Sequence, residues 1–350
     1  MRIHKDFTGG NIRVRSIDGN VIALENELRD SDEWFYWAFC VEDAQGCELT
    51  FNMQETRLGY YGPAVSTDLK NWRWLGTSDS NSFTYRFGAE EKCVYFAHHI
   101  LYHPDRFLEF AKKRSLGITE LCKSLRGRSV PCLAFGEGER SIILTARHHA
   151  CESTGSYVLE GVLSELTDNP IRGARVFCVP FVDYDGVIDG DQGKGRTPHD
   201  HNRDYTENPI YPEVDAIIKY ADHYGCHLGF DFHSPWHKGG ENDNIFIVRN
   251  SIEKQASFDR FSYALQKELL GTEIIYAKEN DHPPMTGWNQ PSTNFGYTMN
   301  LRQECDLAFT LETAYFGTEN NKISTDMLIR LGKSFAKAIK NYIEVRKENY

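Results

Sequence analysis

The chain has 350 residues, of which 40% are hydrophobic and 25% charged, as is ordinary for a soluble globular protein with a sizeable core. Its formal net charge of -11 gives no electrostatic support to binding of a nucleic acid backbone. Residues 1–16 lack the apolar segment of a signal peptide, and no run of about 18 apolar residues occurs, so we expect neither a leader nor a transmembrane helix.

Residues 1–103 show the pattern of a β domain. Short runs rich in valine, isoleucine and aromatic residues are separated by turn signals such as Asp18-Gly19-Asn20. These runs lie at 11–15, 20–24, 33–41, 71–75 and 92–98. Regularly spaced short strands with polar turns predict a small antiparallel β-sandwich, which we expect to form an N-terminal domain.

Residues 104–350 show a different pattern, in which apolar runs alternate with amphipathic segments. Strands are expected at 141–146, 174–180, 227–233, 244–248 and 307–311. Helices are expected to start at Pro104 and to cover 153–166, 211–223, 252–269 and 324–345. This alternation predicts a second domain, built on an α/β sheet with helices on both faces.

The nine cysteines are scattered singly along the chain, and no Cys-x-x-Cys motif is present. This distribution is typical of reduced thiols, so we expect a cytoplasmic protein without a disulfide framework.

The first two candidate metal ligands follow the expected strand at 141–146. His149 and Glu152 lie three residues apart, and an imidazole nitrogen and a carboxylate oxygen are both good zinc ligands. By itself, such a short motif is more often an exposed turn with incidental polar residues.

A third candidate ligand is His233, at the end of the apolar run 227–233. On its own it is equally compatible with a strand-end histidine bonded to a backbone carbonyl. Together with His149 and Glu152, however, it completes a set of two histidines and one glutamate. Such a set leaves the fourth zinc position open for water, as in catalytic sites.

Glu312 stands at the end of a further apolar run, 307–311. It is either an edge glutamate in solvent or the general base that takes a proton from zinc-bound water and passes it to a leaving nitrogen. All these polar residues follow expected strands, and ligands bind at the carboxyl ends of strands in open α/β sheets. Their convergence on one edge favours a catalytic site.

The stretch 183–204 is too polar and glycine-rich for a core element, and long ordered loops of this kind are often functional. It contains Arg196, Asp200, Asn202 and Arg203. An arginine fork can bind a carboxylate by two parallel hydrogen bonds, and asparagine adds directional donors. The alternative is a solvated charged loop.

The ordered set H-x-x-E, N-R, D-x-H-S and F-T-x-E-T resembles the zinc metallocarboxypeptidase (funnelin) family over residues 130–345. The resemblance implies an α/β/α fold with a mixed, mostly parallel sheet of eight strands. It also implies one Zn²⁺ ion and removal of C-terminal residues from peptides or proteins.

By similarity, His149, Glu152 and His233 would hold the zinc ion, and Glu312 would be the catalytic carboxylate. The residues of the loop would contact the substrate and one of the zinc ligands. Asn202 and Arg203 would hold the terminal carboxylate, Arg196 would polarise the scissile carbonyl and stabilise the oxyanion, and Asp200 would orient His149. Arg147 resembles a basic residue that the family carries near its first ligand.

The N-terminal β segment, which ends in FAHHILYHPDRF, resembles the cytosolic-carboxypeptidase branch, whose members often remove glutamates. The chain has HACE where that branch usually has HPGE, but the two ligands are kept. Tyr297 is the nearest counterpart of the family's mobile tyrosine, although gaps make this pairing weak. Arg302 would favour an acidic C-terminal residue if it lined the side-chain pocket, but a salt-bridged surface arginine is the commoner case.

Two other functions remain open at this point. A zinc deacylase of N-acyl amino acids, similar to aspartoacylases and desuccinylases, would use the same ligands, although the N-terminal β segment favours the peptidase. A non-catalytic peptide-binding relative would keep the fold without turnover. The sequence does not determine the preferred C-terminal residue or the oligomeric state.

Overall fold

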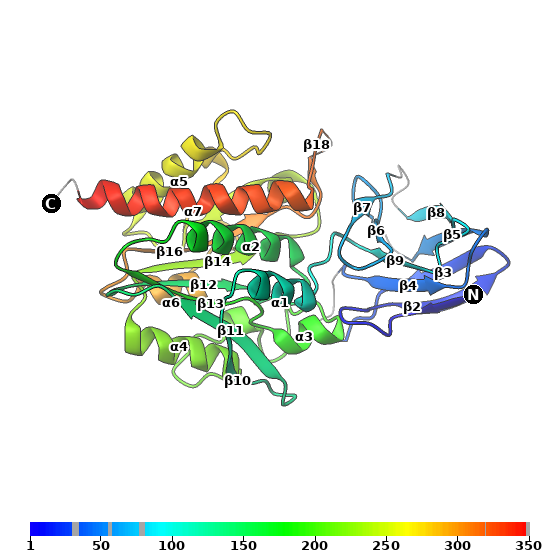
Figure 1. Ribbon diagram of the computed structural model, residues 1–350, viewed down its shortest axis with the longest axis horizontal. Coiled ribbons are helices and arrows are strands. Elements are labelled where there is room, and N and C mark those ends of the chain that lie inside the picture. Colours follow the sequence, from blue (N-terminus) through cyan, green and yellow to red (C-terminus); the bar gives the residue numbers. More distant parts are fainter. Residues whose placement is uncertain (30–34, 55–57, 77–80, 319, 348–350) are drawn as a thin grey trace.

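The computed structural model describes residues 1–29, 35–54, 58–76, 81–318 and 320–347 (Figure 1). The N-terminal part consists of two facing sheets. One has the order β1-β4-β9-β6-β7, and the other has the order β2-β3-β5-β8. Their strands are β1 (Arg2–His4), β2 (Arg13–Asp18), β3 (Val21–Glu25), β4 (Ala38–Glu42), β5 (Glu48–Met53), β6 (Ala64–Ser66), β7 (Arg73–Trp74), β8 (Ser82–Arg86) and β9 (Cys93–Ala97).

Aromatic side chains fill the space between these two sheets. Phe39 and Phe96 from one sheet contact Phe51 from the other, and Phe96 also contacts Phe83, with ring centroids 5.3–5.4 Å apart. The predicted sandwich is confirmed, with one difference: β3 and β5 pair in parallel, whereas the other strand pairs are antiparallel. Of the expected run 33–41, the strand covers only the part from Ala38, and residues 33 and 34 lie outside the described residues.

The second part is built on a sheet of seven described strands in the order β10-β11-β13-β12-β14-β16-β15. These are β10 (Ile118–Lys123), β11 (Ser129–Phe135), β12 (Arg140–Ala146), β13 (Ala174–Val179), β14 (Leu228–His233), β15 (Ile245–Val248) and β16 (Leu307–Thr313). The central strands β13, β12, β14 and β16 are parallel, while β11 and β15 run antiparallel to their neighbours. The expected mixed, mostly parallel sheet is therefore confirmed, with seven described strands instead of eight.

Helices cover both faces of this sheet, as expected (Figure 1). They are α1 (Pro104–Lys113), α2 (Ser153–Asp168), α3 (Tyr184–Asp189), α4 (Pro212–Tyr224), α5 (Gln255–Leu269), α6 (Phe295–Asn300) and α7 (Thr325–Lys347). Alternate residues of β12 pack on opposite faces: Leu144 lies in the core shared with α2, α5 and α7, and Ile143 lies in the core shared with α4 and α6. The sequence did not predict α3, α6, β10 or β11. A two-stranded hairpin, β17 (Gly317–Thr318) and β18 (Asn321–Lys322), precedes α7.

The first turn of α2 presses against the end of β14. A Cβ atom added to Gly155 would lie 2.6 Å from the carbonyl oxygen of Phe232, so only glycine allows this approach. Glu152 immediately precedes α2 and His233 ends β14, and the close packing brings these two residues together. The fold thus places two predicted ligands at one edge of the sheet.

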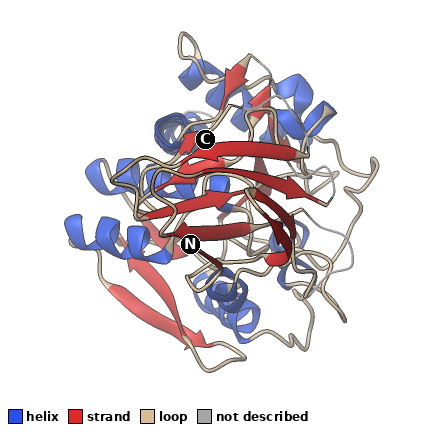
Figure 2. Ribbon diagram, turned by 90° about the vertical axis from the view of Figure 1, so that its right-hand side faces the viewer, coloured by secondary structure: helices blue, strands red, loops and turns tan. Residues whose placement is uncertain are grey.

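The N-terminal sheets pack directly on the second part. Trp74 donates a hydrogen bond to the carbonyl oxygen of Ile323 at 2.8 Å, and Asn11 donates one to that of Gly190 at 2.8 Å. Seen from the end that carries the N-terminal strands, the strands lie in the middle and helices lie around them (Figure 2). Helix α1 begins at Pro104, and the division into domains 1–103 and 104–350 stays a prediction.

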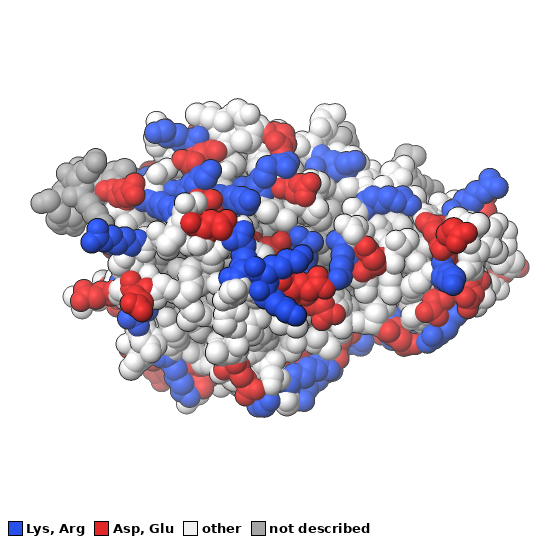
Figure 3. Space-filling model, in the orientation of Figure 1, with Lys and Arg blue, Asp and Glu red and all other residues white. Residues whose placement is uncertain are grey.

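Two surface properties bear on the expected partners. On the face shown in Figure 3, acidic and basic side chains are interspersed, so the charge of -11 is not gathered into one patch there. No helix within the described residues has both the length and the apolar character needed to cross a membrane.

Candidate metal centre and substrate cavity

Three side chains from separate segments converge at the carboxyl edge of the sheet. His149 lies in the turn after β12, Glu152 caps the start of α2, and His233 is the last residue of β14. Because β12 and β14 pair in parallel, with Ala146 opposite Phe232, their ends meet at the same edge.

The carboxylate of Glu152 lies between the two imidazoles. Its Oε1 is 2.9 Å from Nδ1 of His149, and its Oε2 is 2.7 Å from Nδ1 of His233. All three side chains are buried, and one ligand atom from each lies within 4.8 Å of the others. Two nitrogens and one carboxylate that converge in this way match the ligand set of a catalytic zinc ion.

The outer nitrogen of each imidazole faces a carboxylate. Nε2 of His149 is 3.6 Å from Oδ1 of Asp200, and Nε2 of His233 is 2.6 Å from Oδ2 of Asp231. Such partners fix the orientation and tautomer of histidines that bind metals, so both imidazoles suit this role. Asp200 lies where the resemblance implied.

Asp231 was given no role from the sequence, although its spacing from His233 indicates that the two side chains are neighbours. Residues two apart on a strand point to the same face, so the aspartate of D-x-H lies beside His233. Asp231 also accepts hydrogen bonds from Thr145 at 2.8 Å and is 2.8 Å from Nδ1 of His148. Burial would raise the pKa of Asp231, but His148 and His233 lower it below its ordinary value.

Two other groups of side chains within the described residues have metal-ligand chemistry. In one, Asp231 lies between His148 and His233, but His148 does not line the cavity, and its Nε2 is 2.8 Å from the hydroxyl of Tyr205. In the other, His4, Cys40 and Glu42 lie on neighbouring strands of an N-terminal sheet. Of the three groups in the described part of the chain, that of His149, Glu152 and His233 has two members, His149 and His233, in the lining of the cavity.

A cavity of ≈ 380 Å³ opens onto this group. Six of the eight predicted site residues line it: His149, Asp200, Asn202, Arg203, His233 and Glu312. Glu152 is fully buried between the two histidines instead of lining the cavity.

Glu312 lies opposite His233 in the pairing of β14 with β16. Its Oε2 is buried and has no hydrogen-bond partner among the described residues. Burial raises the pKa of Glu312 to about 7, and the Glu152 carboxylate adds to this rise while His233 opposes it. A buried carboxyl beside the cavity, with one oxygen free, is suited to accept a proton from water.

Asn202 and Arg203 lie in a short 3-10 helix, His201–Arg203. Oδ1 of Asp200 accepts a hydrogen bond from the backbone N–H of Asn202 at 2.9 Å and thereby fixes the start of this turn. The Arg203 guanidinium donates to the carbonyl oxygen of Asn202 at 2.8 Å, and Arg203 lines the cavity.

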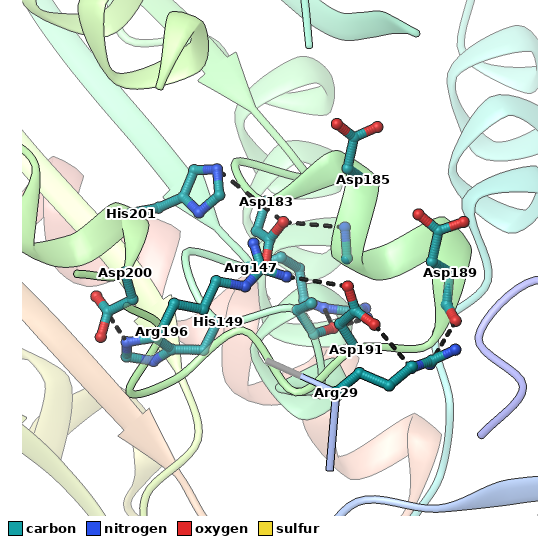
Figure 4. A network of polar contacts seen from close by, with 12 residues as sticks. Arg29, Arg147, His149, Asp183, Asp185, Asp189, Asp191, Arg196, Asp200 and His201 are labelled. Carbon is teal, nitrogen blue, oxygen red and sulfur yellow. Dashed lines mark hydrogen bonds and ion pairs between the residues drawn. The ribbon is translucent and has the colours of Figure 1, made fainter. Parts of the chain in front are cut away.

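The side chain of Arg196 does not line this cavity, and its predicted role stays a prediction. Its Nη2 is 2.9 Å from Oδ2 of Asp183 and 3.3 Å from Oδ2 of Asp191, and both aspartates are buried (Figure 4). These carboxylates hold the guanidinium outside the cavity lining.

Lys194 lines the cavity instead, and the sequence did not single it out. Its Nζ is 3.0 Å from Oε1 of Glu152. Burial opposes the charge of Lys194, but the carboxylates of Glu152 and Glu312 raise its pKa above the ordinary value. The cation beside the candidate metal centre is therefore Lys194.

Three other residues singled out by resemblance also lie outside the cavity lining. Arg147 is buried and donates to the carbonyl oxygen of Ala150 at 2.7 Å. Arg302 pairs with Asp222 at 2.5 Å, which confirms the salt-bridged alternative. Tyr297 is buried in α6.

Comparison with known proteins gives three kinds of similarity. The family model of the cytosolic carboxypeptidase N-terminal domain matches residues 3–99. An uncharacterised protein from Zymomonas mobilis is 31% identical over 81% of this chain and 81% of its own. A metallo-carboxypeptidase structure from Burkholderia cenocepacia has a TM-score of 0.82 at 19% identity and covers 99% of both chains.

The similarity to eukaryotic relatives covers only part of those proteins. Cytosolic carboxypeptidase 2 of Xenopus tropicalis is 30% identical over 45% of this chain, which corresponds to 19% of that relative's length. The chain therefore spans about a fifth of that protein.

Proposed function

Because the chain belongs to the metallo-carboxypeptidases of the cytosolic-carboxypeptidase branch, we propose that it is a zinc-dependent carboxypeptidase that removes the C-terminal residue of peptides or proteins. The observation that carries this proposal is the convergence of His149, Glu152 and His233 beside a cavity that also contains Glu312 and Arg203.

In this proposal one zinc ion would be held by Nδ1 of each of the two histidines and by the carboxylate of Glu152. When bound, zinc would polarise the scissile carbonyl and make water acidic enough to attack it near neutral pH. The buried ligand atoms and the carboxylates behind both imidazoles fit such an ion.

Glu312 handles the proton in the proposed reaction. Its carboxylate accepts a proton from the attacking water while the water oxygen forms a bond to the carbonyl carbon. The carbon–nitrogen bond then breaks, and the same proton passes to the leaving nitrogen to give a free amine. The unpartnered Oε2 of Glu312 supports this role.

Arg203 and Asn202 would hold the C-terminal carboxylate of the substrate. A guanidinium can bind a carboxylate by two parallel hydrogen bonds, and only the last residue of a chain presents a free carboxylate. This contact would restrict cleavage to the terminal peptide bond.

The test compares a peptide that has a free C-terminus with the same peptide amidated, and with N-acyl amino acids. We expect the zinc-loaded protein to release the last amino acid from the free peptide alone. Hydrolysis of N-acyl amino acids in preference to peptides would support the deacylase. Binding of peptide ends without turnover would support the non-catalytic relative.

We further propose that the released residue has an uncharged side chain. Among the described residues that line the cavity, the only lysine and arginine are Lys194 and Arg203, next to Glu152 and Asn202 respectively. The rest of the wall is largely neutral and includes Asn250 and Thr310. An acidic side chain would thus lose water without gaining a cation.

This prediction can be tested with two peptides that differ only in the last residue, glutamine or glutamate, whose side chains have nearly the same size and shape. We expect kcat/KM for the glutamate peptide to be lower by at least about 10-fold, because about 1.4 kcal/mol of uncompensated charge burial suffices for that factor. Equal release of the two residues would contradict the neutral pocket, and faster release of glutamate would restore a glutamyl specificity.

A cytoplasmic location stays a prediction.

A further inference from the structure

We propose that Lys194 is the catalytic cation that binds the scissile carbonyl oxygen and the oxyanion formed from it, a role that similarity assigns to Arg196. This inference rests on the proposed peptidase function and deepens it. Three arginine or lysine side chains of the 183–204 loop compete for the role: Lys194, Arg196 and Arg203.

The position of Lys194 is the first argument. Its Nζ is 3.0 Å from Oε1 of Glu152, whose Oε1 is in turn 2.9 Å from Nδ1 of His149. Its side chain is 26% exposed and lines the same cavity as His149 and Glu312. The ammonium group therefore lies between the candidate metal ligands and the space that a substrate would enter.

The backbone around Lys194 holds it in place. Gly193 and Gly195 both have positive φ angles, 82° and 71°, that favour glycine. A Cβ atom on Gly193 would lie 2.3 Å from the backbone nitrogen of Ala150, so the loop passes directly over the turn that carries His149. The N–H of Gly195 donates to Oδ2 of Asp200 at 3.3 Å. These contacts anchor the loop to the turn and to Asp200.

The other two cations have different partners. Arg196 pairs with Asp183 and Asp191, and Nε of Arg29 is 3.1 Å from the second oxygen of Asp191 (Figure 4). None of these four side chains lines the cavity. Arg203 lies next to Asn202, to which it donates, and is committed to the terminal carboxylate in the proposed function.

The chemistry favours a cation at this point. As the water oxygen bonds to the carbonyl carbon, the π electrons of the carbonyl move to its oxygen, and a proton passes to Glu312. An ammonium can donate a hydrogen bond to this oxygen, and this hydrogen bond becomes stronger as negative charge develops on the oxygen. Lysine is a compact charge on a flexible stem, so Nζ can turn from Glu152 to the oxygen. When the carbon–nitrogen bond breaks, the electrons return to the carbonyl.

The experiment compares Lys194→Met, Lys194→Gln and Lys194→Arg in zinc-loaded enzyme. Removal of one oxyanion donor costs about 10²–10³-fold in kcat, so we expect this loss for the methionine and glutamine variants, with KM changed less than about 3-fold. The arginine variant keeps the charge and should recover part of kcat. Arg196→Lys, which keeps a charge beside Asp183 and Asp191, should retain kcat within about 3-fold.

Two readouts separate a catalytic role from a structural one. Affinity for a phosphinic peptide, which imitates the tetrahedral species, should fall in Lys194→Met by the same factor as kcat, whereas affinity for the product amino acid should not. Zinc affinity, measured by competition with a chromogenic chelator, should stay within about 3-fold of wild type.

The inference fails if Lys194→Met keeps kcat, or if its loss of activity follows a loss of zinc, because the lysine would then only support Glu152. An Arg196→Lys variant with the larger kcat defect would return the role to Arg196. Failure of the proposed function gives a different result: the wild type itself would release no C-terminal residue and would not bind the phosphinic peptide.

Discussion

Replacement of Glu312 by glutamine is expected to lower kcat by about 10³-fold while the protein keeps its zinc, since general acid–base catalysis typically contributes about 10²–10⁴-fold. The amide is nearly the same size as the carboxylate but cannot accept the proton from water. Activity on the free-C-terminus peptide and zinc content by elemental mass spectrometry provide the two measurements.

The design separates proton transfer from metal binding. Glu312 is not among the three converging ligands, so its loss should leave His149, Glu152 and His233 in place. Glu109→Gln, at an exposed site on α1, is the matched control and should keep wild-type kcat. Wild-type activity in Glu312→Gln would exclude the proposed base, and loss of zinc would make Glu312 a ligand instead.

Replacement of Arg203 by methionine should have the second largest effect. Loss of the partner of a hydrogen-bonded charge costs about 2–5 kcal/mol, so we expect kcat/KM to fall by about 10²-fold or more, mainly through a higher KM. The ratio of kcat/KM for the free peptide to that for the amidated peptide should fall with it. Both peptides are measured with wild type and variant.

Arg203→Lys provides the matched control, because it keeps the charge but not the planar fork. Its kcat/KM should lie between those of wild type and Arg203→Met. If all three proteins discriminate equally between free and amidated peptides, Arg203 does not bind the C-terminal carboxylate of the substrate. Asn202 would then be tested alone.

The convergence of the candidate metal ligands was predictable because it depends on strand ends. His149, His233 and Glu312 each follow or end an apolar run, and these runs form the parallel neighbours β12, β14 and β16. Once such strands pair in register, the residues after them meet at one edge without further information. The carboxylate partner of His233 could have been found in the same way, from the two-residue spacing of D-x-H.

The choice between Arg196 and Lys194 was not predictable from the same kind of pattern. Both lie in a glycine-rich loop without periodicity, where the direction of each side chain depends on backbone angles such as those of Gly193 and Gly195. Asp183 and Asp191 fix the position of the Arg196 guanidinium by pairing with it, and nothing in the sequence shows that they face it.

Four strands of the N-terminal part were missed. β1 and β6 contain three residues each, which is too short for an alternating pattern to be recognised. β5 and β8 do alternate between buried and more exposed residues, so their pattern was a usable signal. In the second part, β10 is largely exposed, and β11 contains Pro131, a residue that disfavours a central strand. Their pairing depends on the sheet that forms around them.

An anomalous difference map from crystals soaked in zinc, recorded at the zinc absorption edge, would locate the metal ion. We expect one strong peak bound by His149, Glu152 and His233, on the side that faces Glu312. A peak at His148 and Asp231, a peak only beside His4 and Cys40, or no peak in the cavity would contradict this expectation.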